Sequence, residues 1–330
     1  MIKKSKDIAK EIDFLIENGN PKGNSTGFRR LDEFYTLKYG SFTIILAEPH
    51  SGKSEFGFEL CLNQAERYGK RTLVVSPETG SVSDIYAELI HKYTGRPLQK
   101  KYPNALEQRE VYNAMAYIDE MFSIVDTDER GYTYEEVMKL RTNEDIIFVD
   151  PNNEMTHIFA DRQDIYIEGL TADIRRFCKQ KDVHMIITMH PAKQDVSIDK
   201  VSGKRYFDMP KARMAAGGQA WFRKAMGWIN MWRPPDFLMD VDGMPYPENT
   251  VLIEIEKAKP KGIGKKGTCE LQFDWKRNRY SERSDCGSKV FYAFEHEKGN
   301  QYLTPNDLPD ISAIQANIGF TDQQIEDLPF

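Results

Sequence analysis

The chain has 330 residues, 40% of them apolar and 12% aromatic, which suffices for the core of one sizeable α/β domain with additions. Its formal net charge of −6 excludes a globally basic nucleic-acid-binding surface but leaves room for a local positive groove. Four scattered cysteines without a CxxC pair and the lack of any apolar run of about 18 residues argue against a disulfide framework, a zinc site and a membrane span, so we expect a cytoplasmic protein.

The N-terminal segment predicts an amphipathic helix over residues 5–18. Its apolar positions recur at helical spacing on one face: Ile8, Ile12, Leu15 and Ile16. The Gly-, Asn- and Pro-containing residues that follow indicate a linker up to residue 25. Such a face has to be buried either against its own domain or against a neighbouring subunit, and both possibilities remain open. We therefore separate residues 1–25 from a core over residues 26–300.

A phosphate-binding loop is predicted where this core begins. An apolar, β-branched run at 42–46 indicates a strand, and residues 55–62 indicate a helix, which is the context that such a loop requires. Backbone N–H groups would bind phosphates, Lys53 would reach the β- and γ-phosphates, and the Ser54 hydroxyl would hold Mg²⁺. The candidate nucleotide-binding residues are Ala47, Glu48, Pro49, His50, Ser51, Gly52, Lys53 and Ser54. One of them departs from the usual pattern, because Ala47 stands where Gly is common.

Further strands alternate with helices along the chain. Strands are predicted at 71–76, 121–125, 145–150 and 184–190, and helices at 82–93, 105–119 and 165–181. This alternation predicts an α/β fold with a mainly parallel sheet covered on both faces. Three later strands, at 226–233, 250–257 and 268–274, are expected as antiparallel additions.

Three strands lead into side chains that could act on a nucleotide, because the carboxyl ends of parallel strands meet at the ligand-binding edge. Asp150 can hold Mg²⁺ directly or through water. Glu78 can orient and deprotonate an attacking water, and His190 can sense the γ-phosphate. The alternatives are an Asp that only opens a turn before Pro151 and a His with a structural role.

Residues 191–218 break the alternation of strands and helices. The segment is polar, basic and without periodicity, and so long a stretch in a compact domain is usually functional or disordered. Its basic side chains are Lys193, Lys200, Lys204, Arg205, Lys211 and Arg213.

Together these motifs resemble the RecA-like helicase domain of the DnaB/Twinkle superfamily of ring-shaped replicative helicases, to which phage primase–helicases also belong. The matching segments are residues 26–32, the phosphate loop, 75–78, 149–154 and 189–191. The last two are most similar to the Twinkle branch. Lys257-Ala258-Lys259, followed by a Gly-rich turn and a strand, resembles the Lys-x-Arg hairpin of the family. The resemblance covers roughly residues 26–280, and no primase or zinc-binding part is recognised upstream.

The resemblance implies a three-layer RecA-like P-loop NTPase that assembles as a homohexameric ring, with nucleotide sites between subunits. Lys53, Ser54 and Asp150 would bind ATP, or another NTP or dNTP, together with Mg²⁺. Glu78 would be the catalytic base and His190 the sensor. The trans-acting finger of the family is usually Arg, but the matching position here is a lysine, which cannot make the planar bidentate contact. The candidates for this role are Lys259, Lys257, Arg277 and Arg279.

By the same resemblance, residues 191–218 would line a central channel and bind the backbone of single-stranded DNA, whereas an ordinary solvated loop is the alternative. We expect an NTP-driven replicative helicase, with 5′-to-3′ translocation implied by the family alone. A phage origin would place it in the host cytoplasm. A RecA/RadA-type recombination ATPase and a nucleotide-switched scaffold with weak turnover are the competing hypotheses, and Lys259 keeps the second of them open.

The C-terminal residues 301–330 form an acidic tail that ends in Pro-Phe. The tip Glu326–Phe330 resembles the docking tips of single-stranded-DNA-binding proteins and of phage helicases. A terminal carboxylate with an aromatic anchor suits a basic, apolar pocket, so the tail is expected to bind a replisome partner. A frayed, solubilising tail is the alternative.

Overall fold

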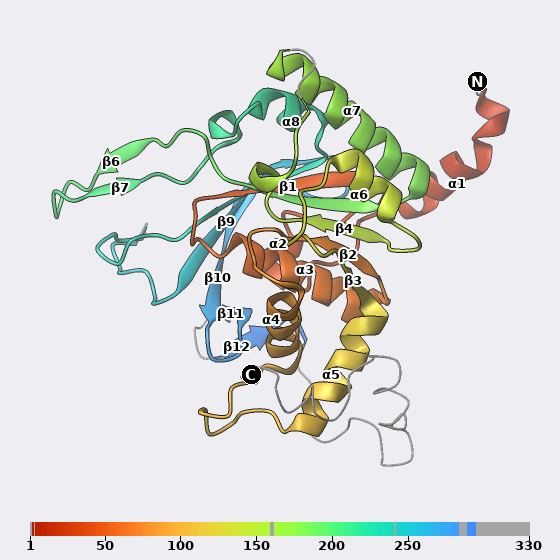
Figure 1. Cartoon of the computed structure of the whole chain (residues 1–330). Coiled ribbons are helices and arrows are strands. Elements are labelled where there is room, and N and C mark those ends of the chain that lie inside the picture. Colours follow the sequence, from red (N-terminus) through yellow and green to blue (C-terminus); the bar gives the residue numbers. More distant parts are fainter. Residues whose placement is uncertain (1, 3, 159–161, 241, 284–288, 295–330) are drawn as a thin grey trace.

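In the part of the chain that the computed structural model describes, a ten-stranded sheet forms the centre of the protein. Figure 1 shows how its strands and helices are arranged. The structure describes residues 2, 4–158, 162–240, 242–283 and 289–294. In spatial order the strands are β12 (Val290–Tyr292), β11 (Arg279–Arg283), β10 (Gly267–Asp274), β9 (Thr250–Ala258), β8 (Gly227–Trp232), β1 (Ser41–Ala47), β5 (His184–Met189), β4 (Ile146–Val149), β2 (Thr72–Val75) and β3 (Phe122–Ile124).

The sheet has a parallel half and an antiparallel half. The strands from β8 to β3 in this order run parallel, and β9 to β12 are antiparallel additions. The predicted α/β fold with a mainly parallel sheet is therefore confirmed. One strand was assigned wrongly, because residues 226–233 were expected to be antiparallel and β8 instead pairs parallel with β1. The unpredicted helix α8 (Gly218–Lys224) precedes β8, as a parallel crossover requires.

Helices cover both faces of the sheet (Figure 1). One apolar core lies beneath α2 (Arg29–Asp32), α3 (Lys53–Tyr68), α4 (Val82–Thr94) and α5 (Gln108–Met121). The other lies beneath α6 (Tyr134–Leu140), α7 (Gln163–Lys181) and α8. Strand β1 serves both cores, since Phe42 and Ile44 enter the second and Ile45 the first, as the two-residue period of a strand dictates. Helix α3 lies close against β4, because a Cβ on Gly57 would come within 2.3 Å of the Phe148 ring.

Helix α1 (Ala9–Asn18) lies at the periphery of the molecule (Figure 1). It follows a 3₁₀ turn at Ser5–Asp7, and none of its side chains is buried. Ile12 is 44% exposed and Ile16 77%. The predicted helix is present, but its apolar face is not covered by its own domain.

The segment after His190 contains a two-stranded hairpin of β6 (Val196–Ile198) and β7 (Arg205–Phe207), which projects from the body (Figure 1). The absence of periodicity in residues 191–218 predicts an irregular segment instead. The strands are only three residues long, and Tyr206 is placed by aromatic contacts with Trp232 and Phe237. Because those contacts come from another segment, periodicity within residues 191–218 could not reveal the hairpin.

Among the described residues, no helix is long and apolar enough to cross a membrane. Among the described residues, Cys61, Cys178 and Cys269 are buried free thiols. Cys286 and the acidic tail 301–330, with its tip Glu326–Phe330, lie outside the described residues.

Candidate active site

The phosphate loop joins β1 to α3 at the carboxyl edge of the sheet. Ala47 is the last residue of β1, fully buried and in register with Met231 of β8. The departure from Gly therefore falls inside a strand, where no left-handed backbone is required. His50 and Gly52 have positive φ angles of 60° and 83°, and α3 begins directly afterwards at Lys53. The loop thus surrounds the N-terminus of a 16-residue helix, where free N–H groups and the helix dipole attract anions.

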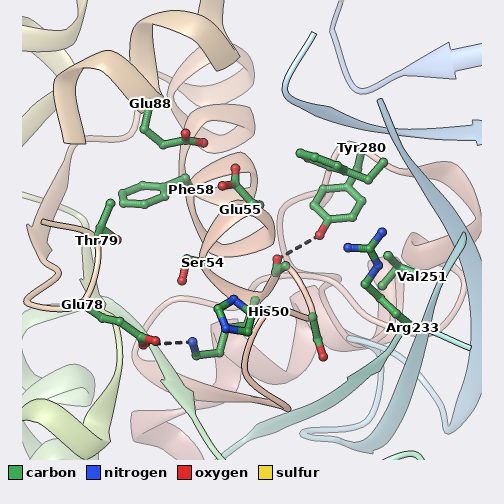
Figure 2. A pocket seen from close by; sticks show the side chains of 14 residues that line it. His50, Ser54, Glu55, Phe58, Glu78, Thr79, Glu88, Arg233, Val251 and Tyr280 are labelled. Carbon is green, nitrogen blue, oxygen red and sulfur yellow. Dashed lines mark hydrogen bonds and ion pairs between the residues drawn. The ribbon is translucent and has the colours of Figure 1, made fainter. Parts of the chain in front are cut away.

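A cavity of about 440 Å³ opens beside this loop (Figure 2). Its size falls in the range of small-molecule sites. The loop side of the cavity is formed by residues 50–55, and the opposite walls come from separate parts of the chain. The walls include Phe58, Glu78, Thr79, Glu88, Arg233, Val251, Phe273 and Tyr280.

Lys53, Glu78 and His190 meet at one carboxylate oxygen. The Lys53 ammonium lies 3.0 Å from Glu78 Oε2, and His190 Nε2 lies 3.2 Å from the same atom. Burial alone would raise the pKa of Glu78, but the Lys53 ammonium and then His190 outweigh it and hold this pKa below its usual value. Glu78 is therefore ionised at neutral pH and, with a side chain 42% exposed, is accessible from the cavity.

The backbone of His190 is tied to the turn that follows Asp150. Its N–H donates to Asn153 Oδ1 at 2.9 Å. Within the described part of the chain, His190 Nδ1 is buried without a hydrogen-bond partner. The imidazole thus has one nitrogen on Glu78 and one buried nitrogen without a partner among the described residues.

Asp150 is fully buried at the end of β4 and is held by three hydroxyl groups. Thr188 donates to Oδ1 at 2.5 Å, and Ser76 and Thr79 donate to Oδ2 at 3.1 and 3.4 Å. The carboxylate is therefore oriented, and one acceptor position of Oδ1 is not used by these three contacts. No group of three or more His, Cys, Asp or Glu among the described residues could hold a metal ion. A bound Mg²⁺ would thus depend on hydroxyl, phosphate and water oxygens with Asp150, a set that suits this ion.

The basic segment begins at this site and leads away from it. Gln194 donates a hydrogen bond to Glu48 of the phosphate loop, which links the two segments directly. Two of the six predicted DNA contacts are paired within the chain, since Lys211 lies 2.6 Å from Glu254 and Arg213 contacts Asp195. The other four side chains are exposed: Lys193, Lys200, Lys204 and Arg205.

The candidates for the finger differ in their surroundings, and none of them lines the cavity of its own chain. Lys257 donates to the carbonyl groups of Phe222 and Arg223 at the end of α8, and burial, followed by the charge of Lys259, lowers its pKa to about 8. Arg279 is 3% exposed and donates to three backbone carbonyl groups, so it holds the fold together. Arg277 lies beside Asp274 and Tyr292.

Arg233 and Tyr280 line the cavity although sequence reasoning did not select them (Figure 2). Arg233 follows β8, the neighbour of β1, at the same edge of the sheet as the phosphate loop. The strand-end rule that selected Glu78 and His190 would have found it if residues 226–233 had been assigned as parallel. Tyr280 comes from β11 in the antiparallel half, and no local signal points to it.

No family model matches the chain. Among curated proteins, the chain is similar to the Twinkle homolog protein, chloroplastic/mitochondrial, of Arabidopsis thaliana, with 26% identity over 205 residues. The match covers 56% of this chain and 28% of that protein, so the chain spans less than a third of the length of this relative.

Two solved structures share the fold. The ATPase domain of G40P matches with a TM-score of 0.65 and 19% identity, over 85% of this chain and 99% of that one. A DnaB-like replicative helicase, solved to describe its interactions with primase, matches with a TM-score of 0.62 and 18% identity, over 85% of this chain and 67% of that one. These likenesses show the RecA-like fold. The similarity to the Twinkle homolog agrees with the resemblance to the DnaB/Twinkle superfamily that the motifs indicated.

Proposed function

We propose that the chain is an NTP-dependent replicative DNA helicase unit that translocates on single-stranded DNA. One juxtaposition carries the proposal. Lys53, Glu78 and His190 meet at a single carboxylate oxygen beside the cavity, and the segment that carries the projecting basic hairpin begins one residue after His190. The chain therefore continues directly from the candidate site of nucleotide hydrolysis into a basic surface that could bind a polyanion.

Lys53 and Glu78 act in sequence on ATP, or on another NTP or dNTP. Phosphate oxygens replace Glu78 as the partner of the buried Lys53 ammonium, because the helix N-terminus and the loop N–H groups favour an anion there. Glu78 is then released to orient and deprotonate the attacking water. Ser54, through its hydroxyl group, and Asp150, directly or through water, would hold Mg²⁺, which would supply positive charge against the phosphates.

Hydrolysis is coupled to DNA through two links between the site and the basic segment. His190 continues directly into Pro191, and Gln194 is bonded to Glu48 of the phosphate loop. A change of contacts at His190 or Glu48 would therefore displace both the phosphate loop and the start of residues 191–218. Salt-sensitive, sequence-tolerant binding of the DNA backbone follows from its exposed lysines and arginine.

A homohexamer, in the host cytoplasm if the chain is phage-encoded, is the assembly that we propose. The exposed apolar face of α1 supports it, because such a face is covered in an assembly rather than left in water. In such an assembly Lys259 would contribute as a point charge to the site of a neighbouring copy. The tip Glu326–Phe330 is proposed as the docking site of a replisome partner.

The decisive experiment measures NTP hydrolysis with and without single-stranded DNA. We expect DNA to stimulate the rate and Lys53→Ala to abolish it, with binding of the DNA weakened as salt rises. A rate that is indifferent to DNA would remove the helicase hypothesis. Imaging the protein with nucleotide and a forked DNA separates the remaining hypotheses, because a closed ring, a helical filament and a monomer correspond to a helicase, a recombination ATPase and a scaffold.

A further inference from the structure

Tyr280 connects the antiparallel half of the sheet to the phosphate loop. Its ring is 1% exposed and packs edge-on against Phe56 of α3, with 5.6 Å between ring centroids. Its hydroxyl group donates a hydrogen bond of 2.9 Å to the carbonyl oxygen of Gly52 (Figure 2). A residue from β11 thus touches the backbone of the loop one residue before Lys53.

The hydroxyl group of Tyr280 occupies the space beside Gly52. A Cβ on Gly52 would lie 2.3 Å from that oxygen, and the φ angle of 83° disfavours any side chain there. The same carbonyl oxygen accepts the first helical hydrogen bond of α3, from Phe56 N–H at 2.9 Å. Because the peptide bond is planar, holding the Gly52 carbonyl on one side fixes the direction of the Lys53 N–H on the other. That N–H is one of the donors that a phosphate group at the helix N-terminus would meet.

A buried group of charges holds Tyr280 in place. The Tyr280 N–H donates to Glu59 Oε2 at 3.0 Å, and Glu59 is 1% exposed. Lys92 of α4 is fully buried, lies 3.6 Å from Glu59, and donates to the carbonyl oxygen of Asn278 at 2.6 Å. Lys92 also pairs with Glu55 and Glu88, at 3.0 and 3.6 Å. One cation therefore binds α3, α4 and the turn before β11 together, and removing it would leave buried carboxylates unpaired.

We propose that Tyr280 is a positioning residue for the triphosphate of the nucleotide. Its hydroxyl group orients the Gly52–Lys53 peptide. The buried Lys92 group, which consists of Lys92, Glu55, Glu59 and Glu88, keeps β11 at the distance at which the Tyr280 hydroxyl can bond to the Gly52 carbonyl. The inference deepens the proposed function and rests on its nucleotide-binding step. It concerns the phosphates, since the contact of Tyr280 is with the loop that binds them.

The test is Tyr280→Phe, which removes the hydroxyl group and keeps the ring. Binding of ADP and of inorganic tripolyphosphate, each with Mg²⁺, is measured by calorimetry. We expect both affinities to fall by the same factor, roughly three- to tenfold, which is the net effect of one hydrogen bond. In steady-state hydrolysis of ATP, KM should rise by that factor while kcat stays near its original value.

Tyr35→Phe is the matched control. Tyr35 is also 1% exposed, and its hydroxyl group is bonded to Thr43 at 2.6 Å, outside the cavity. We expect it to lower thermal stability as Tyr280→Phe does and to leave both affinities unchanged. Equal affinities for Tyr280→Phe and the original protein would overturn the inference. So would a loss for ADP without a loss for tripolyphosphate, because Tyr280 would then contact the nucleoside rather than position the loop.

A coupling measurement strengthens the test. Gly52→Ala should weaken tripolyphosphate binding more in the original protein than in the Tyr280→Phe background, because the clash at 2.3 Å involves the hydroxyl group. Additive effects would contradict the inference, and Tyr280→Phe alone decides it if Gly52→Ala does not fold. If the original protein bound neither ligand, the proposed function itself would fail. That result is distinct from overturning the inference, in which the original protein binds both ligands and Tyr280→Phe binds them equally well.

Discussion

The carboxyl edge of the sheet and the β6–β7 hairpin both carry charged side chains. Those at the edge have hydrogen-bond or ion-pair partners within the chain, whereas those on the hairpin are exposed to solvent. At the edge, Asp150 accepts three hydrogen bonds and the Lys53 side chain is 5% exposed against Glu78. On the hairpin, Lys204 and Arg205 are exposed. Charges that are already held in place suit catalysis on a small ligand that enters a cavity, because only the Lys53–Glu78 pair has to change partners when the ligand binds. Exposed charges on a projecting hairpin suit a long polyanion that arrives from outside.

Glu78→Gln tests the edge and should have the largest effect. The amide can still accept a hydrogen bond from Lys53 but cannot take a proton from water. We expect kcat for NTP hydrolysis to fall by about 10²- to 10⁴-fold, the typical range for a general base, with nucleotide affinity retained. Single-turnover hydrolysis and calorimetry measure the two quantities. Loss of nucleotide binding would instead assign Glu78 a structural role in shaping the site.

The pH dependence of stability tests how completely the parallel half satisfies its own groups. His184 lies at the start of the strand that leads to His190; it is 1% exposed, donates from Nδ1 to the Lys38 carbonyl, and burial lowers its pKa to about 4. The unfolded chain gains this proton near pH 6.5, so between 6.5 and 4 it binds more protons than the folded one. The free energy of unfolding should therefore decrease as the pH falls from 6.5 to 4, by about 3 kcal/mol in total.

Urea unfolding at pH 7 and pH 5 measures about 2 kcal/mol of this loss, because pH 5 lies inside the window, and His184→Gln supplies the comparison. Glutamine keeps an N–H donor for Lys38 but does not titrate, so the decline with falling pH should be shallower in the variant. Equal declines in the two proteins would show that His184 is not buried as a neutral group.

Neutralising the hairpin tests its exposed charges. In the triple variant Lys200→Ala, Lys204→Ala and Arg205→Ala, we expect the affinity for single-stranded DNA to fall about tenfold and the slope of log affinity against log salt to decrease by about 2, at roughly 0.7 per phosphate contact. The matched control replaces Lys139, Lys179 and Lys181 with Ala, which removes the same charge from α6 and α7. A salt slope that changes equally in both variants would assign the effect to net charge rather than to the hairpin.

The exposed face of α1 differs from both regions in being apolar. Substitutions on it should have the smallest effect on the stability of the folded subunit. Because Ile12 and Ile16 are exposed, replacing both with Ser should change the unfolding free energy of the dilute protein by less than about 0.5 kcal/mol. Assembly in the presence of nucleotide, measured by native mass, should weaken. The polar-face control replaces Lys10 and Glu17 with Ser and should assemble normally. Unaltered assembly in the apolar variant would reject docking of α1 on a neighbour.

Much of the candidate site could be predicted because each of its parts is a local pattern. Glu78, Asp150 and His190 follow apolar strands, and parallel strands present their carboxyl ends at one edge. Arg233 escaped the same rule because periodicity does not reveal the direction in which β8 pairs. No local sequence pattern predicts the role of Tyr280, since it reaches Gly52 only because β9 to β11 fold back beside the parallel strands.

By itself, then, the sequence determined the α/β order, the phosphate loop and the strand-end residues, because two-residue and 3.6-residue periods and the Gly-Lys-Ser motif act over a few neighbouring positions. Only the tertiary structure decided the parallel pairing of β8, the hairpin, the exposure of α1 and the buried Lys92 group. Each of these depends on contacts between distant residues, as Lys92 and Asn278, 186 positions apart, demonstrate. Such contacts leave no local pattern, since each partner taken alone resembles an ordinary surface residue.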